Sequence, residues 1–96
     1  MKTYRFYGAI YRDDTHVPGY HCWVPDLNCV LDVGTELDMV DTNASQELTN
    51  ILATAEYISP ARSGIYVVTQ QAKHFLRERN ISLNDLLDIR AVTVQL

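Results

Sequence analysis

The sequence lacks the features that mark several large classes of protein. Its 96 residues include only two cysteines, which are too few for a disulfide framework. No apolar run approaches the roughly 20 residues that a membrane span needs. The first 14 residues contain no long apolar segment followed by a small-residue cleavage site, so we expect no signal peptide. We therefore expect a cytoplasmic protein with free thiols, and its length predicts a single domain over residues 1–96.

Basic residues are missing from the middle of the chain. Residues 13–61 contain nine acids and no Lys or Arg, whereas residues 1–12 contain three bases and no acid. Because nucleic acids bind basic surfaces, we expect no direct DNA binding. Two interpretations of the acidic segment remain, namely a solvated face that aids solubility and a surface that steers a basic protein partner.

The first third of the chain alternates with the period of a β-sheet. Residues 3–11, 20–24 and 29–33 are predicted to be strands, because aromatic and β-branched residues recur at every second position. The last two strands flank Pro25-Asp26-Leu27-Asn28, which has the composition of a turn.

A four-residue turn fixes the pairing of these two strands. It places Val24 opposite Cys29 and Cys22 opposite Leu31, so the two cysteines do not pair directly. Buried small hydrophobic side chains are then the role we expect for both cysteines.

The hydrophobic period changes to that of a helix after Gly34. Apolar residues recur every three or four positions from Leu37 to Ala55, which predicts an amphipathic helix over about residues 36–57. Thr35 followed by Asp38 resembles a capping box at its start. Ser59-Pro60 is expected to end it.

The last third of the chain is predicted to add short helices and a strand. A short helix is expected from about Thr69 to Arg79, with Asn80 ending it and Ser82 capping a further brief turn. Residues 64–88 thus form a helical insertion, and residues 90–96 alternate as a closing strand.

These elements predict an α+β fold. We expect an antiparallel strand meander, a long helix packed on one face and a closing C-terminal strand, in the order βββαβ with extra short helices. A strand reached through helices can lie parallel to the first strand, by a right-handed crossover.

No local motif for nucleophilic catalysis or metal binding is present in the sequence. His16, His21, Cys22 and Cys29 do not have the spacing of a standard zinc site, and His21 and Cys22 point to opposite faces of a strand. We therefore expect no metal, no cofactor and no enzymatic activity.

The stretch GYHCWVPDLNCVLDVGTEL resembles the signature of the HicB antitoxin family. The residues that carry the resemblance are Gly19, Tyr20, Cys22, Val24, Pro25, Asp26, Leu27, Cys29, Gly34 and Leu37. The similarity covers most of residues 3–60 and 90–96. It implies a partial ribonuclease-H-like fold and a protein that binds and neutralises HicA, a small basic ribonuclease toxin.

The chain departs from the family pattern at several places. Asn28 alone separates Leu27 from Cys29, where the family has a longer turn, and Asp41 replaces a common apolar residue. The sequence stops where many relatives continue into a DNA-binding domain, so DNA binding is not carried over. Residues 3–11 also lack the first-strand Asp with which a ribonuclease-H-type metal site typically begins.

The partner-binding residues that we predict lie in and around the hairpin. They are Asp13, Asp14, His21, Trp23, Asp26 and Leu27. The acids are expected to assist encounter with a basic partner, and Trp23 and Leu27 to act as anchors. Alternatively, Trp23 packs beneath the insertion at 64–88. We also expect a homo-oligomer, with a dimer as the first hypothesis.

Two other functional hypotheses remain at this point. One is a phage or mobile-element inhibitor of another nucleic-acid-processing enzyme, for example an anti-CRISPR-like protein that uses an acidic surface. The other is a ribonuclease-H-like nuclease. Lys73, His74, Arg77 and Arg79 form a basic helix surface, which is either solvated or an RNA contact.

Overall fold

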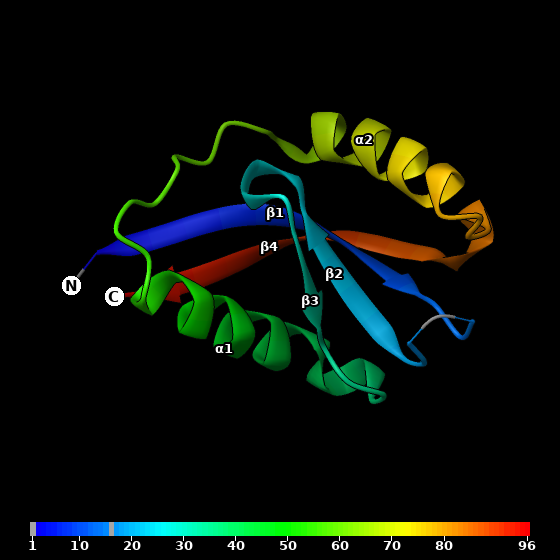
Figure 1. Ribbon diagram of the computed structural model, residues 1–96, viewed down its shortest axis with the longest axis horizontal. Coiled ribbons are helices and arrows are strands. Elements are labelled where there is room, and N and C mark those ends of the chain that lie inside the picture. Colours follow the sequence, from blue (N-terminus) through cyan, green and yellow to red (C-terminus); the bar gives the residue numbers. More distant parts are fainter. Residues whose placement is uncertain (1, 16) are drawn as a thin grey trace.

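Two helices lie on opposite faces of one four-stranded sheet (Figure 1). The computed structural model describes residues 2–15 and 17–96. Its helices and strands are β1 (Thr3–Arg12), β2 (Tyr20–Val24), β3 (Cys29–Asp32), α1 (Val40–Ala53), α2 (Ile65–Glu78) and β4 (Leu86–Gln95). Three short 3-10 turns accompany them, η1 (Pro25–Leu27), η2 (Leu37–Met39) and η3 (Leu83–Asp85). The expected α+β class is confirmed.

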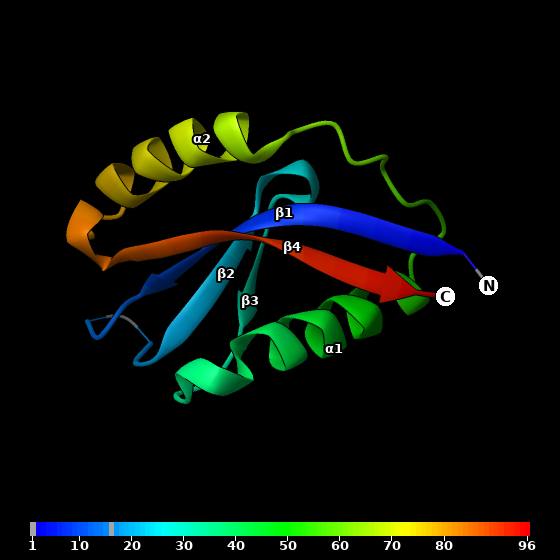
Figure 2. The same cartoon turned by 180° about the vertical axis from the view of Figure 1, so that it is seen from behind.

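The strands are arranged in the order β3-β2-β1-β4, and all neighbours are antiparallel. Val24 lies opposite Cys29 and Cys22 opposite Leu31, so the predicted register of the hairpin is confirmed. The expectation of a final strand parallel to β1 is wrong. After β3 the chain runs along one face of the sheet as α1 and returns along the other face as α2 (Figures 1 and 2). It therefore enters β4 at the end of the sheet where β1 finishes, so β4 runs antiparallel to β1.

The face beneath α1 holds the larger core. Helix α1 buries side chains spaced four residues apart, Val40, Ala44, Leu48 and Leu52. They pack on inward residues of all four strands, among them Phe6, Ile10, Cys22, Val24, Leu31, Val92 and Val94. A Cβ atom at Gly8 would overlap the Sγ atom of Cys22, so glycine permits the close approach of β1 and β2 there.

Helix α1 is shorter than the predicted helix over residues 36–57. A 3-10 turn occupies Leu37–Met39, the α-helix covers Val40–Ala53, and no side chain caps its start, so the predicted capping box is wrong. Leu37 is 55% exposed and Ala55 is exposed, because neither lies over the sheet. Without burial, apolar spacing alone does not extend the helix.

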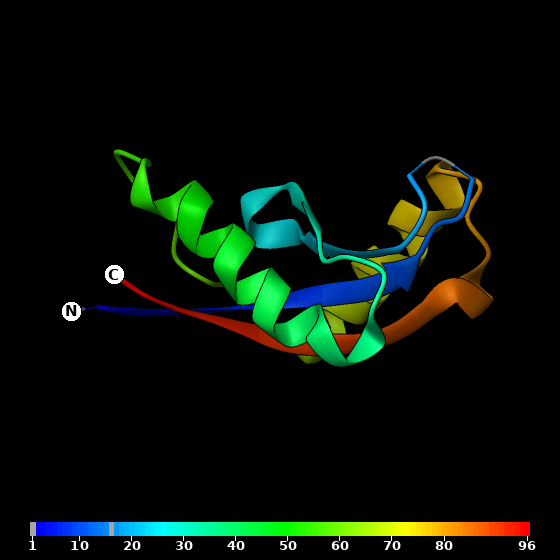
Figure 3. The ribbon, with the colours of Figure 1, turned by 90° about the horizontal axis from the view of Figure 1, so that it is seen from below.

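The second face of the sheet is covered by α2 (Figure 3). This helix is longer than predicted, because residues 65–68 are helical as well. It buries Val68, Ala72 and Leu76. Asn80, with a φ of 58°, follows its end. As predicted, Ser82 caps the following turn, with its Oγ accepting a hydrogen bond from the Asn84 N–H. The expected helical insertion over residues 64–88 thus contains α2 and η3, but its last residues, 86–88, already belong to β4, which begins earlier than the predicted residue 90.

Candidate functional site

The six predicted partner-binding residues do not form one surface. Asp13 and Asp14 lie in the loop after β1, and Asp26 and Leu27 lie in η1 at the other end of β2. His21 and Trp23 project from β2 toward the α2 face, as predicted, on the side opposite Cys22 and Val24.

The two acids after β1 are engaged locally. Asp13 is only 8% exposed, and its Oδ1 accepts hydrogen bonds from the backbone N–H and the hydroxyl of Thr15, at 3.0 and 2.9 Å. Asp14 is exposed and pairs with Arg12 at 3.0 Å, and its hydrogen bond raises the pKa of that guanidinium. Asp13 therefore shapes the loop, and the charge of Asp14 is partly neutralised.

Asp26 joins the hairpin to the segment that leads into α2. Its carboxylate accepts hydrogen bonds from the backbone N–H of Arg62 at 2.8 Å, the backbone N–H of Ser63 at 2.9 Å and the hydroxyl of Ser63 at 2.7 Å. Burial raises the pKa of Asp26, but these hydrogen bonds outweigh it and lower the pKa below its ordinary value. Asp26 is thus an anchor for the crossing between the two helices.

Trp23 helps to hold α2 on the sheet, and His21 is buried on the same face of β2. The Trp23 ring stacks on Phe75 of α2, with ring centroids 4.2 Å apart and planes inclined by 15°. The guanidinium of Arg79 lies over the same Phe75 ring at 4.3 Å. The His21 ring is buried against Tyr11, and its Nε2 lies 2.7 Å from the carbonyl oxygen of Val17. Trp23 therefore packs beneath α2, as the second interpretation of this residue predicted.

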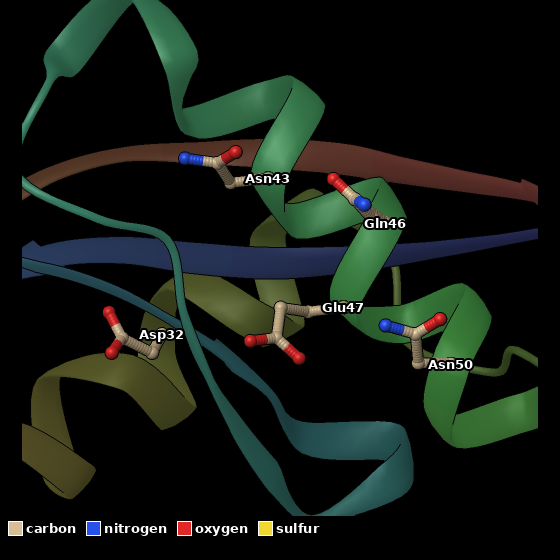
Figure 4. A pocket seen from close by; sticks show the side chains of 5 residues that line it. All are labelled: Asp32, Asn43, Gln46, Glu47 and Asn50. Carbon is tan, nitrogen blue, oxygen red and sulfur yellow. The ribbon is translucent and has the colours of Figure 1, made fainter.

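A polar groove lies between α1 and the free edge of the sheet. Its volume is about 200 Å³, and its lining residues are Asp32, Asn43, Gln46, Glu47 and Asn50 (Figure 4). Four of these come from one stripe of α1, beside the stripe that packs on the sheet. The fifth, Asp32, comes from the end of β3.

The groove is built on a fixed backbone. The side-chain amide of Asn43 donates to the carbonyl oxygen of Val33 at 2.9 Å, which ties α1 to the chain after β3. Asp32 accepts a hydrogen bond from the Gly34 N–H at 3.2 Å. Within residues 2–15 and 17–96, no ion pair involves Asp32 or Glu47. Both carboxylates are therefore available to a basic partner.

Strand β3 presents unpaired backbone groups beside this groove. It is an edge strand, and the Val33 N–H donates to the carbonyl of Tyr20 at 3.2 Å. Hydrogen-bonded pairs alternate along an antiparallel ladder, so the N–H and C=O groups of Val30 and Asp32 point away from β2. The side chain of Val30 is 39% exposed.

The two helical layers carry opposite charges. Between Asp32 and Glu56 the chain has six acids and no base, whereas residues 62–79 have four bases and one acid. Asp41 is the acid of α1 that is paired, with Arg90 of β4 at 2.7 Å. The groove thus belongs to the acidic side of the molecule. The sequence contained the polar stripe of α1, but only the strand order shows that it faces a free edge.

Neither thiol is placed for chemistry at neutral pH. Burial raises the pKa of Cys22 to about 12 and also raises the pKa of Cys29. In the described part of the chain, no group of three or more His, Cys, Asp or Glu residues could hold a metal ion. His16, one of the candidates considered for zinc, lies outside the described residues. None of the described helices has the length and apolar character to cross a membrane.

Comparisons of the chain with protein-family models, with curated proteins and with solved structures found no match.

Proposed function

We propose that this chain is a non-catalytic protein inhibitor of the HicB antitoxin type, which binds and neutralises a small basic ribonuclease of the HicA type. The observation that carries the proposal is the acidic groove beside the free edge of β3, where Asp32 and Glu47 form no ion pair with any described residue. The HicB-like sequence pattern of residues 19–37 supports the same assignment.

An extended basic segment of the toxin fits this site as an added strand. Its backbone would pair with the outward N–H and C=O groups of Val30 and Asp32. Side chains that point toward α1 would meet the amides of Asn43 and Asn50 and the carboxylate of Glu47. Backbone pairing then provides affinity, and the acids provide selectivity for Lys and Arg.

The fold is compatible with this family. The meander β1-β2-β3, the helix α1 on one face and a closing strand beside β1 support the proposed partial ribonuclease-H-like arrangement. Helix α2 and the antiparallel direction of β4 are additions to the pattern that we expected. Because the RNA substrates of such a toxin are intracellular, we propose that the inhibitor acts in the cytoplasm.

Co-expression with a HicA-type ribonuclease tests the proposal. The toxin alone should stop bacterial growth, and this chain should restore growth and copurify with the toxin. The variant Asp32→Asn with Glu47→Gln should lose both effects. The matched control, Glu56→Gln with Asp85→Asn, removes the same number of charges outside the groove and should retain them.

Two results would contradict the proposal. Equal activity of the groove variant and the control would remove the groove as the binding site. If the chain failed to bind any HicA-type toxin but bound another basic nuclease, the inhibitor of a different nucleic-acid enzyme would be the correct function.

A further inference from the structure

We propose that the free edge of β4 pairs with β4 of a second copy, so that two sheets join across a twofold axis. Strand β4 has ten residues, and its one partner among the described strands is β1, so its outer edge is longer than the edge formed by β3. Figure 2 shows β4 running across the front of the molecule, with α1 on one side and α2 on the other. Long free edges are sites of association unless something blocks them.

The hydrogen bonds show which residues of β4 point outward. Lys2 and Leu96 exchange both backbone hydrogen bonds, at 2.5 and 2.8 Å. Alternation along the ladder then pairs the even residues of β4 with β1 and turns the N–H and C=O groups of Ile89, Ala91 and Thr93 outward. In the single chain the outward N–H of Ile89 donates to Oδ1 of the adjacent Asp88 at 2.9 Å, and pairing with a second copy would replace this local bond. The hydroxyl of Ser45 donates to the carbonyl of Thr93 at 2.7 Å, which agrees with this assignment.

A twofold antiparallel pair must place outward residues opposite outward residues. If the axis passes through Ile89, Asp88 lies opposite Arg90 of the second copy, and Arg90 lies opposite its Asp88. If the axis passes through Arg90, two arginines lie opposite each other. If the axis passes through Ala91, Arg90 lies opposite Val92 of the second copy and gains no opposite charge. Thr93 would then have to pair with Ile89 of the second copy, although its carbonyl already accepts a hydrogen bond from Ser45. Opposite charges across strands stabilise and like charges destabilise, so the first register is favoured.

The side chains near this axis complete the fit to a second copy. Asp88, Arg90 and Asp41 are already linked within one chain, at 2.9 and 2.7 Å, and the Arg90 side chain is 40% exposed. On the other face Ile89 would meet its own copy. Leu87 lies beside it, is left out of the register with β1 by a bulge, and is 46% exposed. Strand β4 thus offers a second copy both complementary charges, Asp88 and Arg90, and an apolar residue, Ile89, that would contact its own copy.

This interface is separate from the acidic groove, because β3 and β4 are the opposite edges of the sheet. The dimer would therefore leave both β3 edges free for a partner. Its formation needs no toxin, so it can be tested independently of the proposed function.

Analytical ultracentrifugation of the full chain tests the dimer. We expect the wild type to be dimeric and Ile89→Pro to weaken dimerisation about 10- to 100-fold, because the outward N–H that pairs on the axis is lost from both copies. Thr93→Pro is the matched control. It removes another outward N–H of the same strand, outside the proposed register, and should stay dimeric. Circular dichroism verifies that both variants fold.

Cross-linking tests the register. Residues of a hydrogen-bonded antiparallel pair have Cα atoms about 5.5 Å apart, which suits a disulfide. Oxidised Ile89→Cys should therefore form a covalent dimer, and Ala91→Cys should not. A wild type that is monomeric, a dimer that survives Ile89→Pro, or efficient cross-linking through Ala91→Cys instead of Ile89→Cys would each overturn the proposal.

Discussion

Asp26 connects two parts of the chain that are far apart in sequence. It lies in η1 and accepts three hydrogen bonds from Arg62 and Ser63. Asp26→Ala leaves these donors without their acceptor, and the penalty for losing such a bond is about 1–3 kcal/mol. We therefore expect a lower free energy of unfolding in urea at pH 7. Asp14→Asn, which affects only an exposed ion pair with Arg12, should change that free energy by less than about 1 kcal/mol.

The acid dependence of stability should also depend on Asp26. Its pKa is lower in the folded protein than its ordinary value, so the folded state binds its proton less readily than the unfolded state. The stabilisation is present above the unfolded pKa of about 4 and is lost as pH falls through the folded pKa. Asp26→Asn should therefore show a smaller loss of stability below about pH 4 than the wild type. Identical acid dependence of the two proteins would contradict this assignment.

The cysteines should differ in reactivity. Cys22 is fully buried and burial raises its pKa to about 12, whereas Cys29 is only partly buried and its pKa is raised to a lesser degree. Since the thiolate is the reacting species, iodoacetamide at pH 8 should leave Cys22 unmodified in the folded protein and label Cys29 slowly. Both should react in urea. Mass spectrometry of the peptides separates the two, and rapid native labelling of Cys22 would contradict the packing described here.

At the level of elements, α2 is attached to the sheet partly through the ring pair of Trp23 and Phe75. Phe75→Ala removes the stacked ring and should cost about 3 kcal/mol or more. Trp23 is the single tryptophan, so its fluorescence reports the change, and we expect an emission shift to longer wavelength. Gln70→Ala, on an exposed position of the same helix, is the control. Unchanged fluorescence in Phe75→Ala would mean that α2 does not cover Trp23.

The apolar stripe of α1 is the centre of the larger core. Leu48 is fully buried, so Leu48→Asp places an unpaired charge in an apolar environment and should unfold the domain or cost more than about 4 kcal/mol. Gln46→Asp, two positions earlier and exposed, introduces the same group at a tolerated site. Thermal unfolding distinguishes them, and a Leu48→Asp protein as stable as the wild type would contradict the assigned core.

The hydrophobic period and the turn residues predicted which helices and strands form, but not where each one ends or how they are arranged in space. The register of Val24 with Cys29 followed from the length of the turn, which is a local property. The end of α1 near Ala53 depended on where the sheet stops supporting the helix, and the direction of β4 depended on a second helix crossing. The groove could not be predicted for the same reason, since Asp32 and Glu47 line one groove only because α1 runs beside the edge of β3.

Across the whole molecule, the sheet separates an acidic layer from a basic one. The acids from Asp32 to Glu56 belong to α1 and the segments around it, and the bases from Arg62 to Arg79 belong to α2 and the segment before it. A basic ribonuclease would therefore approach from the α1 side. Asp13 accepts hydrogen bonds within its own loop and Asp26 accepts them from Arg62 and Ser63, so both of these predicted steering charges also support the fold.

The acidic side of the molecule should affect the kinetics of toxin binding. Charge attraction mainly raises association rates and is screened over about 8–10 Å at physiological salt. Neutralising Asp32, Glu36 and Glu47 together should therefore slow association with a HicA-type toxin and flatten its dependence on salt, with little change in dissociation. Neutralising Asp13 and Asp26 should instead lower the stability of the free protein, as measured by urea unfolding.

Stopped-flow mixing over a range of salt concentrations measures these rates. The variant Val30→Lys tests the strand edge. It places a positive charge on β3, beside the position proposed for the basic segment of the toxin, and repulsion between the two should speed dissociation. Trp23→Ala should weaken the fold through loss of the Phe75 stack, rather than act on the interface. An association rate that depends neither on salt nor on Asp32, Glu36 and Glu47 would show that the acidic layer does not guide the partner. The affinity would then have to come from backbone pairing at β3 alone.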